Sequence, residues 1–137
     1  MKFKKIRLLE TGFNPGPWNM ALDEVLLNNC IDGSEPILRL YGWSPACVSV
    51  GYFQSIEEEV NLDRCRQLGV DVVRRMTGGG AVLHEFELTY SFITKKFPFN
   101  ILDSYKLICA PVTECINKLG FKAKYVPLND IIVDNKK

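Results

Sequence analysis

The sequence has 137 residues, 47% of them hydrophobic and 24% charged, a composition that fits one globular domain with a substantial core. Its formal net charge of +1 gives no electrostatic reason to bind nucleic acid, and no apolar run approaches the roughly 20 residues of a membrane span. Five cysteines without a Cys-x-x-Cys pair and a single histidine argue against a disulfide framework or a zinc site, so we expect a cytoplasmic protein without a resident metal.

The first part of the chain predicts a strand, a helix and a pair of strands. KFKKIRLLE (residues 2–10) is expected to be a strand, which the breaker run GFNPGP ends. A helix is expected over about residues 18–31, where apolar side chains recur at helical spacing. Asp23 and Glu24 then fall early in this helix, where its dipole favours acidic side chains. PILRLYGW and ACVSVGYFQS follow as two strands around a turn at Ser44-Pro45.

The next elements are a short helix, two strands and a longer helix. The short helix is expected to begin after Asn61, which can cap it, and to stop before Gly69. VDVVRRM and ELTYSFITKK are predicted strands on either side of a triple-glycine loop. A helical period covers residues 101–119, so Pro111 should either kink this helix or mark its start, and Gly120 should end it.

The order of these elements predicts an α/β protein of the α+β type. We expect a mixed sheet flanked by helices, not a doubly wound parallel sheet. The final segment, IIV followed by Asp134-Asn135, is typical of the first arm of a hairpin and its turn. The returning arm is absent, so we expect residues 1–137 to be part of a larger domain.

The stretch VRRMTGGGAVLHE (73–85) carries most of the functional signal. Gly78–80 can take positive φ, and successive peptide N–H groups in such a loop can form a nest for an anion. Arg74 and Arg75 are fork-shaped donors suited to phosphate or carboxylate, although in a strand they point to opposite faces. The same residues also fit a plain glycine-rich hairpin with two solvent arginines. The pattern is neither a Walker phosphate loop nor a dinucleotide fingerprint.

Other residues allow both a functional and a structural interpretation. His84 could act as a base, but without a second histidine or an adjacent nucleophile a packing role is favoured. Trp18, Trp43 and Phe53 could line an apolar slot or belong to the core. Asp130 fits either a metal–phosphate unit or a turn, and the two final lysines fit a solvated tail.

These motifs together resemble a known family. NMALDE, GYFQ, RRMTGGGAVLHE and PLNDIIVDNKK match the lipoate–protein ligase A family in order and spacing, from about residue 6 to the last residue. The resemblance implies the catalytic fold of biotin and lipoate ligases, which is related to class II aminoacyl-tRNA synthetases. It also implies that lipoate and ATP, with Mg²⁺, form lipoyl-AMP before the acyl group passes to a lysine. The implied acceptors are lipoyl domains of 2-oxoacid dehydrogenase E2 or the glycine-cleavage H protein.

The resemblance also implies a set of site residues. Those expected to bind ATP are Arg75, Gly78, Gly79, Gly80, Ala81, Val82, Leu83 and Asp130. Gly79, His84 and Lys137 are expected to bind lipoate. Lys137 is the implied catalytic residue, which bridges the carboxyl oxygen and the α-phosphate by its charge, and Lys136 is the less favoured choice. No metal ligand is implied.

Two other functions stay open. An octanoyltransferase of the same superfamily moves an acyl group from a carrier protein through a cysteine thioester without ATP, and YGWSPACVSVGYFQ and ELTYS look like one of its branches. That branch is expected to carry its cysteine shortly before NDI, where YVPLNDI has none, and this favours the ligase. The second alternative is a non-catalytic subunit that works with a partner chain. Biotin ligation is disfavoured because the Gly-Arg-Gly-Arg loop of that family is absent.

Overall fold

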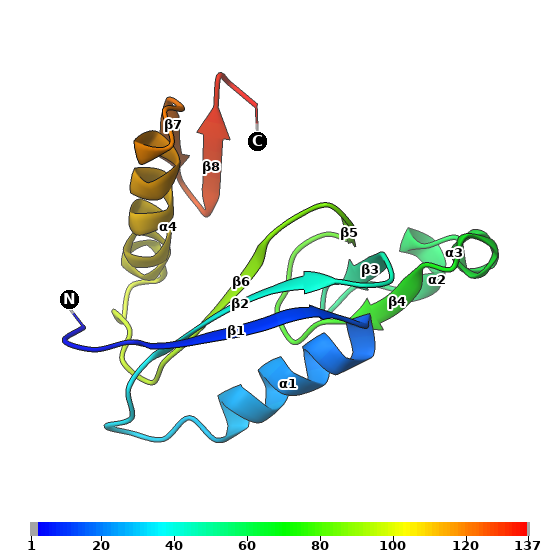
Figure 1. The fold of residues 1–137 in the computed structure, drawn as a ribbon, viewed down its shortest axis with the longest axis horizontal. Coiled ribbons are helices and arrows are strands. Elements are labelled where there is room, and N and C mark those ends of the chain that lie inside the picture. The colour runs from blue at the N-terminus through cyan, green and yellow to red at the C-terminus, as the bar shows by residue number, and fades with distance from the viewer. Residues whose placement is uncertain (1–2, 137) are drawn as a thin grey trace. The chain divides into compact units, whose positions relative to one another are not determined.

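The computed structural model describes residues 3–136, which divide into two compact units. The larger unit spans Lys5–Lys95, and the smaller unit holds the chain from Lys96 onward with the residues before Lys5. The larger unit contains β1 (Arg7–Asn14), α1 (Gly16–Asn28), β2 (Ile37–Trp43), β3 (Cys47–Val50), α2 (Ile56–Glu59), α3 (Leu62–Leu68), β4 (Asp71–Arg74), β5 (Val82–His84) and β6 (Thr89–Ile93) (Figure 1). The smaller unit contains α4 (Ile101–Lys118), β7 (Ala123–Val126) and β8 (Asp130–Val133).

The first sheet of the larger unit has the strand order β1-β2-β6 and is mixed. β1 and β2 are parallel and are joined through α1, which lies along one face of the sheet, whereas β2 and β6 are antiparallel (Figure 1). The predicted break at GFNPGP is wrong, because β1 continues to Asn14 through an irregularity between Glu10 and Phe13. Gly12 takes a φ of +67° there, which lets the strand bulge and resume its pairing.

Helix α1 also differs from its predicted limits. It begins at Gly16, directly after Pro15, and has Pro17 in its first turn, a position that a proline tolerates well. It ends at Asn28, and the side chain of the following Asn29 donates to the Val25 carbonyl at 2.8 Å. Asp23 is therefore in the middle of the helix and not in its first turn.

The second sheet has the strand order β4-β3-β5, with β3 at its centre. β3 is parallel to β4 and antiparallel to β5, so the glycine loop that joins β4 to β5 crosses the end of β3. The plain hairpin interpretation of this loop is therefore wrong. The sequence pattern also missed β5, whose three residues are too few to show an alternation.

Local capping signals predicted α3 well. The region before α3 was predicted less well. The Asn61 side chain accepts from the Arg64 amide at 2.9 Å, and Gly69 follows the helix with a φ of +66°, as expected. The predicted strand ACVSVGYFQS, in contrast, ends at Val50 and is followed by a turn and α2, a single helical turn.

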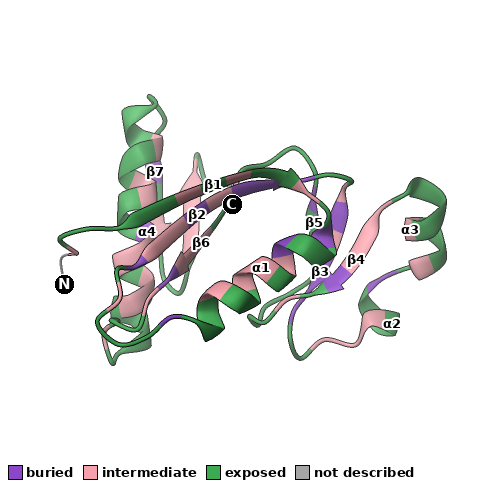
Figure 2. Cartoon of the chain, turned by 60° about the horizontal axis from the view of Figure 1, so that its bottom comes forward, coloured by how far each residue is buried: buried purple, intermediate pink, exposed green. Residues whose placement is uncertain are grey.

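The core of the larger unit lies where α1, the end of β2 and the second sheet meet. Tyr41, Trp43, Cys47 and Val73 form a buried cluster against which Met20 packs. Figure 2 shows the buried residues gathered on β2, on β3 and at the start of α1. Polar buried residues also lie here, and several of them belong to the site described below.

In the smaller unit α4 packs against the hairpin formed by β7 and β8. α4 runs unbroken through Pro111, so the expectation that the helix starts at this proline is wrong. Asn100 caps its first turn, and Gly120 follows its end with a φ of +96°. Asp134 and Asn135 form a tight turn with positive φ at both positions, as predicted. The strand β7 was not predicted, and Lys137 lies outside the described residues.

Candidate functional site

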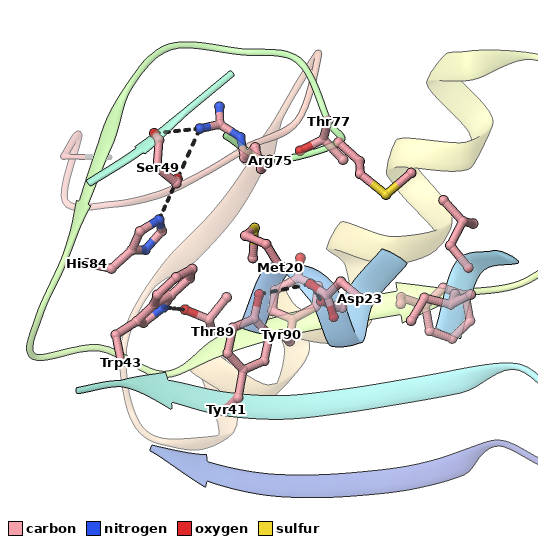
Figure 3. A pocket seen from close by; sticks show the side chains of 15 residues that line it. Met20, Asp23, Tyr41, Trp43, Ser49, Arg75, Thr77, His84, Thr89 and Tyr90 are labelled. Carbon is pink, nitrogen blue, oxygen red and sulfur yellow. Dashed lines mark hydrogen bonds between the residues drawn. The ribbon is translucent and has the colours of Figure 1, made fainter. Parts of the chain in front are cut away.

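A pocket of about 390 Å³ lies in the larger unit, a volume typical of small-molecule sites. Its walls come from α1, the end of β2, β6 and the residues that enter the glycine loop (Figure 3). One end is polar and contains Ser49, Arg75 and His84, and the walls beyond it are largely apolar. Of the three aromatic residues considered from the sequence, Trp43 lines this pocket, whereas Trp18 and Phe53 do not.

Arg75 holds the glycine loop in shape. Its Nη2 donates to the carbonyls of Gly78 and Gly80, at 2.9 and 2.7 Å. Its Nη1 donates to the carbonyl and the hydroxyl of Ser49, at 2.9 and 3.1 Å, and burial lowers the pKa of the guanidinium. Both Nη groups are thus bonded to protein oxygens, and a phosphate could reach them only by displacing one of these contacts.

Arg74 stabilises the neighbouring turn in the same manner. Its Nη1 lies 2.7–3.0 Å from the carbonyls of Gly51, Tyr52 and Gln54. The two arginines therefore point to different loops, as expected from strand geometry. The loops themselves pack backbone to backbone, because the Tyr52 amide donates to the Thr77 carbonyl and a Cβ on Gly51 would overlap the carbonyl oxygen of Gly79.

A chain of hydrogen bonds runs from Ser49 to Trp43 along the polar end of the pocket. Ser49 Oγ lies 2.7 Å from His84 Nε2, and His84 Nδ1 lies 2.6 Å from Glu87 Oε1. Thr89 Oγ1 donates to the same carboxylate oxygen and accepts from Trp43 Nε1. The Trp43 and His84 rings are stacked with centroids 4.1 Å apart. Because an ionised carboxylate only accepts, His84 carries a proton on Nδ1, and in the neutral imidazole Ser49 donates to Nε2.

The order Ser49–His84–Glu87 has the connectivity of a hydrolytic triad, but the serine is not placed as a nucleophile. Ser49 is only 1% exposed, in the central strand β3. Its oxygen also accepts from Arg75, so one of the lone pairs that an attack would need is already occupied. The arrangement therefore links the glycine loop to the imidazole, and it supports the packing role that the sequence favoured for His84.

A second polar network anchors α1 to the first sheet. Arg39 is fully buried and forms an ion pair with Asp23 at 2.7 Å, and it also binds the carbonyl and side chain of Asn19. Tyr41 and Ser91 donate to the other oxygen of Asp23, and burial raises the pKa of Tyr41 to about 12. Sequence reasoning missed these roles, although NMALDE contains both Asn19 and Asp23.

The structure brings only some of the predicted site residues together. The glycine loop, Arg75 and His84 lie within one unit, and the segment from Gly78 to Leu83 is exposed. Asp130 begins β8 in the smaller unit, and Lys137 is outside the described residues. The assignments of Arg75, Gly78, Gly79, Gly80, Ala81, Val82, Leu83 and Asp130 to ATP, and of Gly79, His84 and Lys137 to lipoate, stay predictions.

The cysteines of the described residues differ strongly in accessibility. Cys30, Cys47 and Cys109 are buried, as expected of core fillers, whereas Cys115 is exposed. None of the residues that line the pocket, all of them in the described part of the chain, is a cysteine. Between residues 3 and 136, no group of three or more His, Cys, Asp or Glu side chains is arranged to hold a metal, and no helix is long and apolar enough to cross a membrane.

Cys47 should resist alkylation under conditions that modify Cys115. Burial, with a smaller contribution from Asp71, raises the pKa of Cys47 to about 12, so almost no reactive thiolate forms near neutral pH. Treatment of the native protein with iodoacetamide at about pH 8, followed by peptide mass mapping, should show Cys115 modified and Cys47 intact. Denaturation should expose both. Equal modification in the native protein would contradict the buried position of Cys47.

Comparison with protein families and curated proteins gives consistent matches. A family model described as the lipoyl protein ligase A/B catalytic domain matches residues 15–137. The chain is 42% identical over 122 residues to an octanoyltransferase named LipM from Macrococcus caseolyticus, covering 85% of this chain and 44% of that protein. Other bacterial octanoyltransferases of the same name are 39–49% identical. The chain thus spans less than half the length of these curated relatives.

Solved structures confirm the predicted fold. A bi-partite lipoate protein ligase from Thermoplasma acidophilum, described with its E2 lipoyl domain, matches with a TM-score of 0.86 and 34% identity, covering 96% of this chain and 52% of that one. A lipoate-protein ligase A bound with ATP matches with a TM-score of 0.81 and 36% identity, covering 97% and 55%. The catalytic fold of biotin and lipoate ligases is therefore the fold of this chain.

Proposed function

Because the chain belongs to the lipoyl protein ligase A/B catalytic domain family, we propose that its pocket binds a medium-chain acyl group for transfer to a lysine of a lipoyl domain. The family contains both transferases and ligases, and we propose that the whole protein is an octanoyltransferase. The observation that carries this choice is the identity of 39–49% to proteins named octanoyltransferase, against 34–36% to the ligases of known structure.

This choice reverses the preference reached from the sequence. The ligase was preferred there because no cysteine precedes NDI. The relatives named octanoyltransferase now weigh against the ligase. The occupied Nη groups of Arg75 also support a transferase, since they are bonded to Ser49 and the loop instead of being turned outward for a triphosphate. No lining residue of the pocket is a cysteine, so the thioester-forming group of the proposed reaction is not among them.

The polar end of the pocket suits the carbonyl end of an acyl group. Arg75 places a half-buried positive charge there, and the hydrogen bonds from Ser49 to Glu87 fix the imidazole without ligand. Preorganised dipoles and charges of this kind stabilise a developing oxyanion because they need no reorganisation during the reaction. The alkyl chain would extend from this end between α1 and β6.

A lipoate–protein ligase is the second candidate function. The match to a ligase bound with ATP favours it, as does the exposure of the glycine loop, whose backbone a nucleotide could approach. In this alternative ATP with Mg²⁺ and lipoate are the substrates, and Lys137 bridges carboxylate and phosphate. The archaeal ligase is paired with an E2 lipoyl domain, and such domains are the proposed acceptors here for either reaction.

The full-length protein should octanoylate a lipoyl domain without ATP. The measurement is the mass gained by a purified lipoyl domain, with octanoyl carrier protein as donor in one reaction and octanoate, ATP and Mg²⁺ in the other. We expect the octanoyl mass in the first reaction and none in the second. An acceptor whose target lysine is replaced by arginine is the control. Acylation that requires ATP would establish the ligase instead.

A further inference from the structure

Part of the pocket lining can be grouped into three layers that follow one another along α1. Met20, Asp23 and Leu27 lie on one face of this helix at positions i, i+3 and i+7, and all three line the pocket. Opposite them, the alternate residues Thr89, Ser91 and Ile93 of β6 share one face of the strand. The pairing of β2 with β6 fixes the sequence of layers, because Tyr41 pairs with Thr89 and Ile37 with Ile93.

The three layers differ in chemistry. The first layer is next to the polar end, since Trp43 both bonds Thr89 and stacks on His84 (Figure 3). The middle layer is polar but satisfied, because Asp23 accepts from Arg39, Tyr41 and Ser91. The third layer is apolar and consists of Leu27, which is 43% exposed, and Ile93, which is 7% exposed.

The distances between the layers can be compared with the extended length of an alkyl chain. At about 3.3 Å per strand residue, the middle layer lies roughly 7 Å and the third layer roughly 13 Å from the first. An extended chain of 1.5 Å bonds advances about 1.3 Å per carbon, so six carbons span roughly 6 Å and eight carbons roughly 9 Å. A six-carbon chain therefore ends beside Asp23, whereas an eight-carbon chain passes it toward Leu27 and Ile93.

We infer that Leu27 and Ile93 hold the methyl end of the acyl chain and set the chain length that the pocket prefers. This inference rests on the proposed function, because it takes the occupant to be an acyl group with its carbonyl at the polar end. Chains that stop at the middle layer leave the apolar third layer uncovered. An eight-carbon chain passes the middle layer and ends roughly 4 Å short of the third layer, within contact distance of the Leu27 and Ile93 side chains, and that contact is the source of the preference.

The test compares two fatty acids on matched variants. The shift of the Trp43 indole N–H resonance is followed by NMR while sodium hexanoate or sodium octanoate is titrated into the protein. The parent should bind octanoate roughly tenfold more tightly than hexanoate, the gain expected from burying two further methylene groups. Leu27→Ser should reduce this ratio to about two. A Trp43 resonance that still shifts with hexanoate shows that the variant is folded.

Val25→Ser is the matched control. Val25 lies on the same helix and is 54% exposed, but it lines a different hollow, so the ratio should stay at the parent value. An unchanged ratio in Leu27→Ser would overturn the inference while leaving the acyl-binding function in place. If neither acid shifted the Trp43 resonance of the parent, the proposed function of the pocket would itself be contradicted.

Discussion

Replacing Gly51 with alanine is expected to reduce acyl transfer by the full-length protein on the order of 10²-fold, the cost of misplacing a site by about 1 Å. An added Cβ would overlap the carbonyl oxygen of Gly79. The neighbouring atom belongs to the backbone, so no side chain can rotate away and the glycine loop itself must move. That movement would also disturb the contacts of Arg75 with Gly78 and Gly80.

Gly78→Ala is the control for this prediction. A Cβ at Gly78 would meet no atom within 4 Å, and the residue needs no positive φ. Initial rates of octanoyl transfer should therefore be near those of the parent. Circular dichroism should show that both variants are folded at the assay temperature. Equal rates for Gly51→Ala and the parent would mean that the position of the loop does not matter to the reaction.

Removing the carboxylate of Asp23 should strongly destabilise the protein. Arg39 has no exposed surface, and Asp23→Ala would leave its charge buried without a counter-ion. The loss of one partner from a buried pair costs about 3–5 kcal/mol in the free energy of unfolding, which urea titration can measure. Tyr41 and Ser91 would lose an acceptor as well.

An exposed ion pair in the same unit supplies the comparison. Asp63 and Arg66 lie 2.7 Å apart on α3, the same separation as Asp23 and Arg39, but both side chains are more than 70% exposed. Asp63→Ala should leave the free energy of unfolding nearly unchanged, because water replaces the lost partner. Similar losses for the two variants would show that the Asp23 pair is far more hydrated than its geometry indicates.

Features that depend on neighbouring residues could be predicted from the sequence. The cap at Asn61, the left-handed glycine at Gly69 and the turn at Asp134-Asn135 all rest on interactions over a few residues, and all are present. The predicted fold is likewise confirmed by the solved relatives. The motif RRMTGGGAVLHE contributes Arg75, Met76, Thr77 and His84 to the pocket lining, and the function predicted for it stays a prediction.

Features that depend on distant pairing could not be predicted. Nothing in the residues around the glycines indicates that β4 and β5 lie on opposite sides of β3, which comes more than 20 residues earlier. The partner of Asp23 is likewise 16 positions away on another element, so the acid looked like a favourable charge near a helix start. β1 extends past its breaker residues because Gly12 takes a conformation that other residues avoid.

The hydrogen bonds from Arg74 and Arg75 to the loop carbonyls affect the entropy cost of ligand binding. Three successive glycines would ordinarily mean a disordered segment that a ligand must immobilise, with a loss of conformational entropy. Here Arg75 and Arg74 already hold the two packed loops through their backbone carbonyls. A ligand at this site therefore meets a surface whose ordering entropy was lost when the protein folded, and more of its contact energy is retained as affinity.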